Sequence, residues 1–152
     1  MSRIQKKAPL SMHLRFPLFG ALTLFLVSGP ALALDTWTQT TERGLPVLSL
    51  SSGDGALRIV CDPDRVFGPT PNGAVVVNLP KDKTAATVVF LAKGGEQARL
   101  TVTKGTAAQA ANDAAEWSKM VAIVKAGGEF AVVSSHDSLS FETAPLPDLA
   151  CD

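Results

Sequence analysis

Apolar and polar residues alternate with a period of two over most of the chain after the first 33 residues, which is typical of β-strands that bury one face. In one of these stretches Leu57, Ile59 and Cys61 share a face, so the cysteine is expected to point into the core with its neighbours. The alternation predicts strands at residues 35–42, 46–51, 56–62, 74–79, 86–92, 97–103, 129–134 and 138–143.

Turn residues separate these predicted strands. Gly94 and Gly95 stand between two strands and accept the positive φ that a hairpin turn requires. A polar turn at residues 135–137 separates the last two strands. The order favours a meander of antiparallel strands.

One segment, residues 106–125, breaks the alternation and predicts an amphipathic helix. It is rich in alanine, and its apolar residues recur at steps of three and four, which places them on one helical face. Thr106 is a suitable N-cap, and Gly127 with Gly128 is a suitable stop. The predicted stripe consists of Ala110, Ala114, Trp117, Val121 and Val124.

These elements together predict an α+β fold. We expect an antiparallel β meander or sandwich-like sheet of six to eight short strands, with the one amphipathic helix packed on it and one disulfide. Trp117 lies on the apolar face of the helix, so we expect it in the core rather than at a surface.

The first 33 residues follow a different pattern. Basic residues come first, an apolar run occupies residues 16–27, and Ala31 and Ala33 are small residues at the positions that signal peptidase reads. This pattern predicts a signal peptide at 1–33, cleaved after Ala33, and a single small globular domain at 34–152. The mature protein is then expected in the periplasm or secreted.

Two alternatives concern this N-terminal segment. An uncleaved membrane anchor would need about 20 consecutive apolar residues, and this run is shorter and is interrupted by Pro17 and Gly20. Translation could also begin at Met12, because the chain from there to Ala33 reads as a compact signal peptide.

Charge narrows the range of partners. Four of the 14 basic residues and none of the 14 acidic ones precede residue 34, which leaves ten basic against 14 acidic residues after cleavage. The charges are dispersed, whereas binding to nucleic acid or to an anionic membrane needs a concentrated positive field. We therefore expect neither nucleic acid nor, after signal cleavage, a membrane as partner.

The chain has two cysteines, Cys61 and Cys151. In an oxidising compartment an even count favours pairing, so we predict a Cys61–Cys151 disulfide. A metal pair or a reactive thiol is the alternative, but a metal site needs further ligands at short spacing, and His136 is the one histidine after residue 33. The bridge would hold a proline-rich C-terminal tail against a strand.

One cluster of residues, Ser134-Ser135-His136-Asp137-Ser138, carries types used in hydrolysis. On a tight turn we expect the neighbouring Ser and His side chains to diverge, and no G-x-S-x-G elbow is present. Exposed turns commonly collect such residues. We therefore expect no enzymatic activity, with a small hydrolase using His136 as the alternative.

Carboxylates on two loops suggest a second kind of site. Asp62 and Asp64 flank a proline, and Asp54 lies in a Gly-rich turn, as calcium ligands often do. Neither loop has enough oxygen ligands for an EF-hand, and turn-forming Asp is the commoner reading. The paired glycines at 94–95 and 127–128 do not open a helix after a strand, so they predict no phosphate site. We expect neither a bound metal nor a cofactor, with cation or ligand binding as an alternative.

Trp37 is the candidate for contact with a partner protein. It lies in a strand of otherwise polar residues, which predicts that its large side chain is exposed. Exposed tryptophans are frequent anchors of protein interfaces.

The strand 57–62 that ends in Cys-Asp, Phe141 in the last strand and the terminal Cys151 carry a resemblance. The order of elements resembles a group of small exported bacterial proteins associated with type VI secretion or with envelope functions. The chain departs from that group in its shortened, proline-rich approach to the last cysteine. The resemblance implies an envelope accessory role, with an envelope or secreted protein as partner and no catalytic residues to carry over.

Overall fold

The computed structural model describes residues 34–146, 148, 149 and 151. The predicted signal peptide and its cleavage site lie outside these residues. The described chain forms nine strands, one α-helix and one short 3-10 helix. The strands are β1 (Thr38–Glu42), β2 (Leu45–Ser52), β3 (Gly55–Val60), β4 (Ala74–Asn78), β5 (Thr87–Ala92), β6 (Gln97–Thr101), β7 (Thr106–Ala108), β8 (Gly128–Val133) and β9 (Ser138–Thr143).

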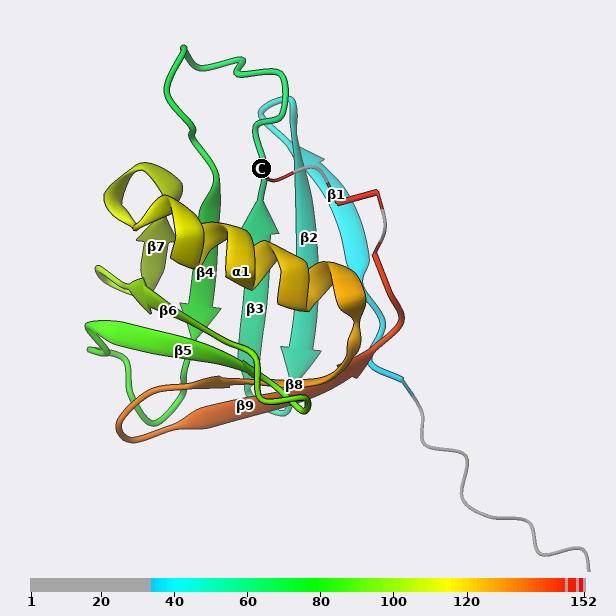
Figure 1. The fold of residues 1–152 in the computed structure, drawn as a ribbon, viewed down its shortest axis with the longest axis vertical. Helices are drawn as coiled ribbons and strands as arrows, with labels where there is room; N and C mark the ends of the chain where they lie inside the picture. The colour runs from blue at the N-terminus through cyan, green and yellow to red at the C-terminus, as the bar shows by residue number, and fades with distance from the viewer. Residues whose placement is uncertain (1–33, 147, 150, 152) are drawn as a thin grey trace, which may run out of the picture. The chain divides into compact units, whose positions relative to one another are not determined.

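The strands form two antiparallel sheets. The first has the order β1-β2-β3-β4-β7 and the second the order β6-β5-β8-β9. In Figure 1 the strands of the second sheet cross the lower ends of β2 to β4 at a steep angle. The predicted class, an antiparallel sandwich-like β fold with one helix and one disulfide, is confirmed.

Cross-strand pairing decides which residues of the first sheet face the core. Leu48 is opposite Ile59 and Leu50 is opposite Leu57, so these four share one face. Leu50, Leu57 and Ile59 are buried, with 1 %, 0 % and 0 % of their surfaces exposed. The period-two pattern of the sequence therefore assigned this face correctly.

The helix α1 (Ala114–Ala126) lies across the first sheet in Figure 1. It buries Trp117, Met120, Val121, Ile123 and Val124, so the prediction that Trp117 lies in the core is confirmed. It ends at Gly127, whose φ of 65° and ψ of −154° form a combination that essentially only glycine adopts. Glycine is required there also because a Cβ would lie 2.6 Å from the backbone nitrogen of Pro145.

The start of the helix was predicted wrongly. Thr106 does not cap it but begins β7, which pairs with β4, and the 3-10 helix η1 (Gln109–Ala111) follows. The side chain of Asp113 is the N-cap and accepts from the backbone N–H groups of Ala115 and Glu116 at 2.9 and 3.1 Å. Alanine is a strong helix former, but pairing with a neighbouring strand outweighs this intrinsic preference.

Two further expectations need correction for the same reason. Ala110 and Ala114, placed by the sequence on the buried stripe, are exposed. The short β7 also raises the number of strands in the described chain to nine, above the expected six to eight.

Candidate functional site

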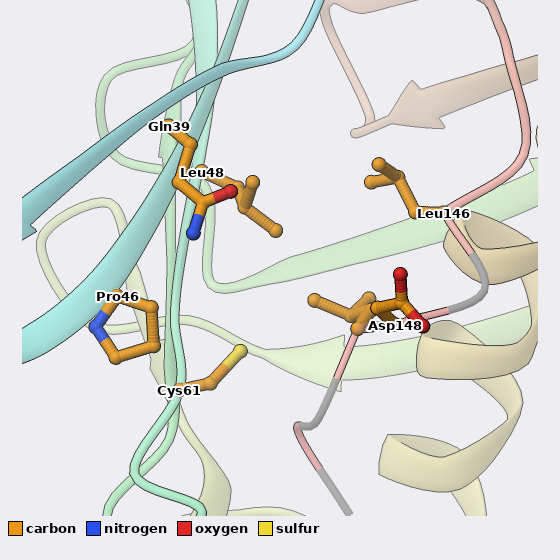
Figure 2. Close-up of a pocket in the computed structure, with 7 residues that line it drawn as sticks. Gln39, Pro46, Leu48, Cys61, Leu146 and Asp148 are labelled. Carbon is orange, nitrogen blue, oxygen red and sulfur yellow. The ribbon is translucent and has the colours of Figure 1, made fainter.

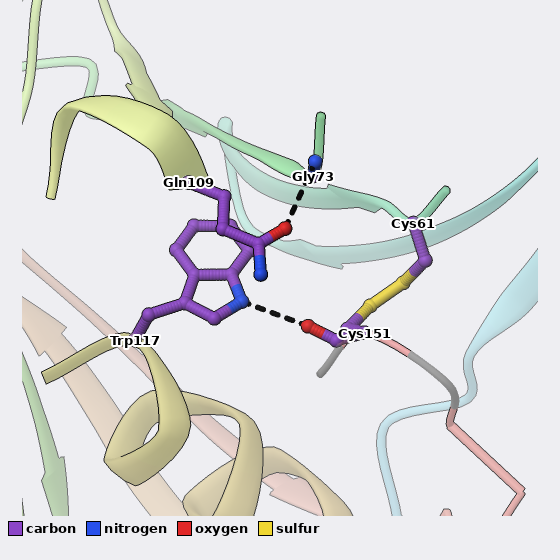
Figure 3. The surroundings of a disulfide bond; sticks show 5 residues. All are labelled: Cys61, Gly73, Gln109, Trp117 and Cys151. Carbon is purple, nitrogen blue, oxygen red and sulfur yellow. Dashed lines mark hydrogen bonds between the residues drawn. A yellow bond between two sulfur atoms is a disulfide. The ribbon is translucent and has the colours of Figure 1, made fainter. Parts of the chain in front are cut away.

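The disulfide joins the end of β3 to the C-terminal tail. Cys61 and Cys151 are bonded, with Cα atoms 4.9 Å apart and exposed fractions of 2 % and 3 %, so the predicted pairing and the inward direction of Cys61 are confirmed. The indole N–H of Trp117 donates to the carbonyl oxygen of Cys151 at 2.8 Å (Figure 3). A covalent bond and a buried hydrogen bond therefore hold this end of the tail.

The segment from Cys61 to Gly73 is fixed at both ends. Gly73 donates its N–H to the side-chain oxygen of Gln109 at 3.1 Å (Figure 3). Gln109 donates its own N–H to the carbonyl of Gly73 at 2.7 Å. A Cβ at position 73 would lie 2.8 Å from the Trp117 ring, so only glycine fits without a shift. The disulfide at Cys61 and the hydrogen bonds at Gly73 therefore fix both ends of the loop between β3 and β4.

The loop between β3 and β4 is organised by a buried carboxylate. The side chain of Asp62 accepts from the N–H of Val66 at 2.7 Å and from that of Phe67 at 3.4 Å. Its carbonyl accepts from the N–H of Arg65, which has a φ of 52°. Asp62 is 9 % exposed, whereas the side chains that it positions are outside: Val66 is 60 % and Phe67 58 % exposed.

This geometry assigns Asp62 a use other than cation binding. Its oxygens are engaged by backbone N–H groups, and the neighbouring Asp64 is exposed. Across the described ranges no group of three or more His, Cys, Asp or Glu residues is placed to hold a metal ion. One sequence signal could have revealed this role: two adjacent apolar residues in a loop, Val66 and Phe67, follow an Asp by four and five positions.

A hollow lies beside Phe67 on the outer face of the first sheet. It has a volume of about 400 Å³ and is lined by Glu42, Arg43, Leu45, Val47, Val60 and Phe67. Its walls come from the end of β1 and the turn that follows, from β2, from the end of β3 and from the loop that carries Phe67. The exposed loop and this hollow form one surface, whose apolar residues are bordered by the charged Glu42 and Arg43.

A second groove lies on the inner face, beside Cys61 of the disulfide (Figure 2). It has a volume of about 330 Å³ and lies between β1 to β3 on one side and the C-terminal tail on the other. Figure 2 shows Leu146 and Asp148 of the tail across from Gln39, Leu48 and Cys61. The lining is largely aliphatic, and Asp148 supplies its one ionisable side chain among the described residues.

The turn between β8 and β9 holds the candidate hydrolytic residues. Contrary to the expectation that they diverge, the Ser135 hydroxyl lies 2.9 Å from Nδ1 of His136. Asp82 of the β4–β5 loop lies 3.5 Å from the same nitrogen. In a catalytic triad the Ser and the Asp contact opposite nitrogens of the ring, so this arrangement is not that of a triad.

The electrostatics of this turn centre on Asp82. A hydrogen bond from Ser134, and to a lesser extent the neighbouring His136, hold the pKa of the Asp82 carboxyl below its usual value. Asp137 accepts from the N–H groups of Lys81 and Ser138 at 2.8 and 2.9 Å. The side chain of His136 is 75 % exposed, so the cluster joins two loops without forming an enclosed site.

Trp37 is not exposed to the extent that the sequence predicts. It precedes β1 and lies half-buried against the core, since alternation places it on the same face as Gln39. Among the described residues its indole N–H finds no hydrogen-bond partner. The proposed contact of Trp37 with a partner protein stays a prediction.

Comparison with known proteins gives no further guidance. No protein-family model matches the chain. No curated protein and no solved structure matches it either. In the part of the chain that the structure describes, no helix has the length and apolar content needed to cross a membrane. The resemblance to small exported envelope proteins therefore stays a prediction.

Proposed function

We propose that this chain is an exported, disulfide-bonded module that binds another envelope or secreted protein and has no catalytic activity of its own. The observation that carries the proposal is the loop between β3 and β4. Its buried Asp62 carboxylate holds the backbone so that Val66 and Phe67, two large apolar residues, stand 60 % and 58 % exposed.

Exposed apolar side chains on an ordered loop favour an interaction role. Burying such surface in an interface stabilises a complex by about 25 cal/mol per Å². A flexible loop would lose conformational entropy on binding, whereas this one is already held by the contacts of Asp62. The arrangement thus provides a pre-organised aromatic anchor of the kind found at interface hot spots.

The surroundings of Phe67 support the same function. The hollow of about 400 Å³ beside it is lined by Leu45, Val47 and Val60 and bordered by Glu42 and Arg43. An apolar centre with a charged margin is the usual anatomy of a protein interface. The hydrolase alternative has less support, because Ser135 and Asp82 approach the same nitrogen of His136.

Site-specific photo-cross-linking tests this function in cells that export the protein. We expect Phe67→benzoylphenylalanine to form a covalent adduct with one protein of defined mass. Leu91→benzoylphenylalanine is the matched control, since Leu91 is an apolar residue 41 % exposed on β5 of the other sheet. Equal adducts at both positions, or none at Phe67, would contradict the proposal.

A loss-of-binding variant completes the test. Phe67→Ser should weaken capture of the cross-linked protein about tenfold or more, the effect of removing an interface anchor. Leu91→Ser should leave capture unchanged. Both variants should keep the melting temperature of the parent, because Phe67 is 58 % and Leu91 41 % exposed and neither belongs to the buried core.

A further inference from the structure

The four outer edges of the two sheets differ in how far their outward backbone groups have hydrogen-bond partners. An outer strand offers unpaired N–H and C=O groups that can pair with another chain, and folded proteins usually cover them. The outer strands here are β1 and β7 in the first sheet and β6 and β9 in the second. On three of them, contacts within the chain engage outward backbone groups: on β6 at Arg99 and Thr101, on β7 along the strand, and on β9 at the Glu142 end.

Side chains near the start of α1 cover β6. The N–H of Arg99 donates to the Glu116 carboxylate at 2.7 Å, and the N–H of Thr101 donates to the Asn112 side-chain oxygen at 2.7 Å. The amide nitrogen of Asn112 donates in turn to the carbonyl of Thr101 at 3.2 Å. The open side of β6 is therefore occupied.

Main-chain and side-chain contacts cover β7 and the Glu142 end of β9. On β7, Thr103 and Thr106 exchange N–H···O bonds of 2.9 and 3.0 Å, and the carbonyl of Ala108 accepts from Asn112 at 2.8 Å. At one end of β9, the N–H of Asp35 donates to the backbone carbonyl of Glu142 at 2.7 Å, and the Asp35 carboxylate accepts from the N–H of Glu142 at 2.9 Å.

The edge formed by β1 differs. All five of its residues are exposed, and within the described residues its backbone has no partner beyond β2. The bond from Cys61 N–H to the Pro46 carbonyl shows that Pro46 and Leu48 face β3. By alternation, the open backbone groups of β1 belong to Gln39 and Thr41.

The same two residues place their side chains on the face that holds the groove. Gln39 is opposite Leu48 and Thr41 is opposite Pro46, and Gln39, Leu48 and Pro46 all line the groove beside the disulfide. A strand added to β1 would put the side chain opposite Gln39 on this same face. A strand added here would therefore pair with the open backbone groups of β1, and its side chains at alternate positions would lie on the face that holds the apolar groove.

We propose that β1 binds an extended segment of another protein, which adds as a strand beside Gln39 and Thr41 and directs a large apolar side chain into the groove. This inference rests on the proposed binding function and names the form of the partner. Backbone hydrogen bonds would give affinity and the groove would give specificity, as in other strand-addition complexes. Asp148 also lines the groove, and residues two positions apart in the added strand share a face. The carboxylate of Asp148 therefore favours a basic residue two positions from the apolar residue of the added segment.

A second copy of this chain does not fit the same surface. Pairing β1 with β1 of another molecule would bring the side chains of Gln39 and Thr41 toward the groove, and neither is apolar. A self-association of this kind would leave Leu146 and Leu149 of the groove without an apolar partner. The occupant is therefore a different protein.

An array of synthetic peptides that alternate threonine with leucine and lysine tests the proposal on the purified, oxidised protein. The expected result is binding that shifts the backbone amide resonances of Gln39 and Thr41. N-methylation of the peptide at alternate positions should weaken binding about tenfold when the methylated nitrogens face β1, and have little effect when they face away. This comparison leaves the protein unchanged, so misfolding cannot explain it.

Protein variants make the same distinction. Thr41→Pro removes an outward N–H and should weaken peptide binding about tenfold, whereas Thr41→Ala keeps that N–H and should bind like the parent. Asp148→Asn should weaken only peptides with lysine. A peptide set that leaves the amide resonances of Gln39 and Thr41 unchanged would overturn the proposal, and so would concentration-dependent dimers formed through β1. Cross-linking at Phe67 could still succeed in either case, so the two failures are distinguishable.

Discussion

Two loops of this molecule are held by aspartates that accept backbone N–H groups, yet they present opposite surfaces. In the loop between β3 and β4 the carboxylate of Asp62 orders the chain, and Val66 and Phe67 stand exposed. In the turn between β8 and β9, Asp137 plays the same local part, and the exposed residues are Ser135 and His136.

The contrast shows that residue types alone do not identify the functional surface. The turn has the residues of a hydrolase, but its geometry is that of a solvated connection between two loops. The loop has carboxylates that resemble cation ligands, but its main carboxylate is engaged with the backbone and what it displays is apolar. Exposure and hydrogen-bond partners distinguish the two.

The largest effect is expected from removing the disulfide, which ends immediately before Asp62. Cys151→Ser should reduce the free energy of unfolding by about 3–5 kcal/mol in oxidising buffer, because the bridge closes a separation of 90 residues. The loop and the C-terminal tail should become more sensitive to protease, and the turn at His136 should not. Denaturant unfolding and limited proteolysis measure this.

The thiol content provides the control for that experiment. The exported, unreduced protein should contain no thiol that a labelling reagent can modify after denaturation, because both cysteines are in the bridge. If Cys151→Ser loosened both loops equally, the proposed difference between them would be wrong.

A pair of aspartate variants sharpens the comparison. Asp62→Ala should cost about 1–3 kcal/mol of stability, since it leaves the N–H groups of Val66 and Phe67 without their acceptor in a partly buried loop. Asp137→Ala should cost less, since its partners lie at an exposed turn. Only Asp62→Ala should also reduce cross-linking at Phe67, and an equal loss with Asp137→Ala would contradict the assignment.

The acid response of the turn is a smaller effect with a defined sign. The pKa of Asp82 is lowered in the folded protein from its ordinary value of 3.8. Its contribution to stability is therefore present above that pH and is lost as the pH falls from 3.8 through the lower folded value. Asp82→Asn should make the unfolding free energy less dependent on pH below about 4, and an unchanged acid profile would show that Asp82 does not contribute.

The sequence predicted the parts of the fold that follow from local patterning. Alternating residues located β2 and β3 and placed Leu57, Ile59 and Cys61 in the core, and paired glycines located the turn after β5. The start of α1 was predicted wrongly because an alanine-rich segment satisfies helix propensity, while β7 depends on pairing with a strand about 30 residues earlier.

The candidate surfaces depend still more on tertiary contacts. The exposure of Phe67 follows from hydrogen bonds to Asp62, and the groove lies between the first strands and a tail that the disulfide joins to β3. The open edge of β1 can be recognised only after the strand pairing and the contacts of the other edges are known. Each of these requires knowing which distant segments meet, which periodicity does not report.

The smallest effect is expected from His136→Ala. The side chain of His136 is 75 % exposed, so its loss should change stability by no more than about 0.5 kcal/mol. Binding of the protein cross-linked at Phe67 should be unchanged, because the turn and the loop lie on different elements. The decisive measurement is a substrate screen of the parent and the variant side by side. A hydrolytic activity that disappears with His136→Ala would reverse the comparison and make the turn, not the loop, the functional surface.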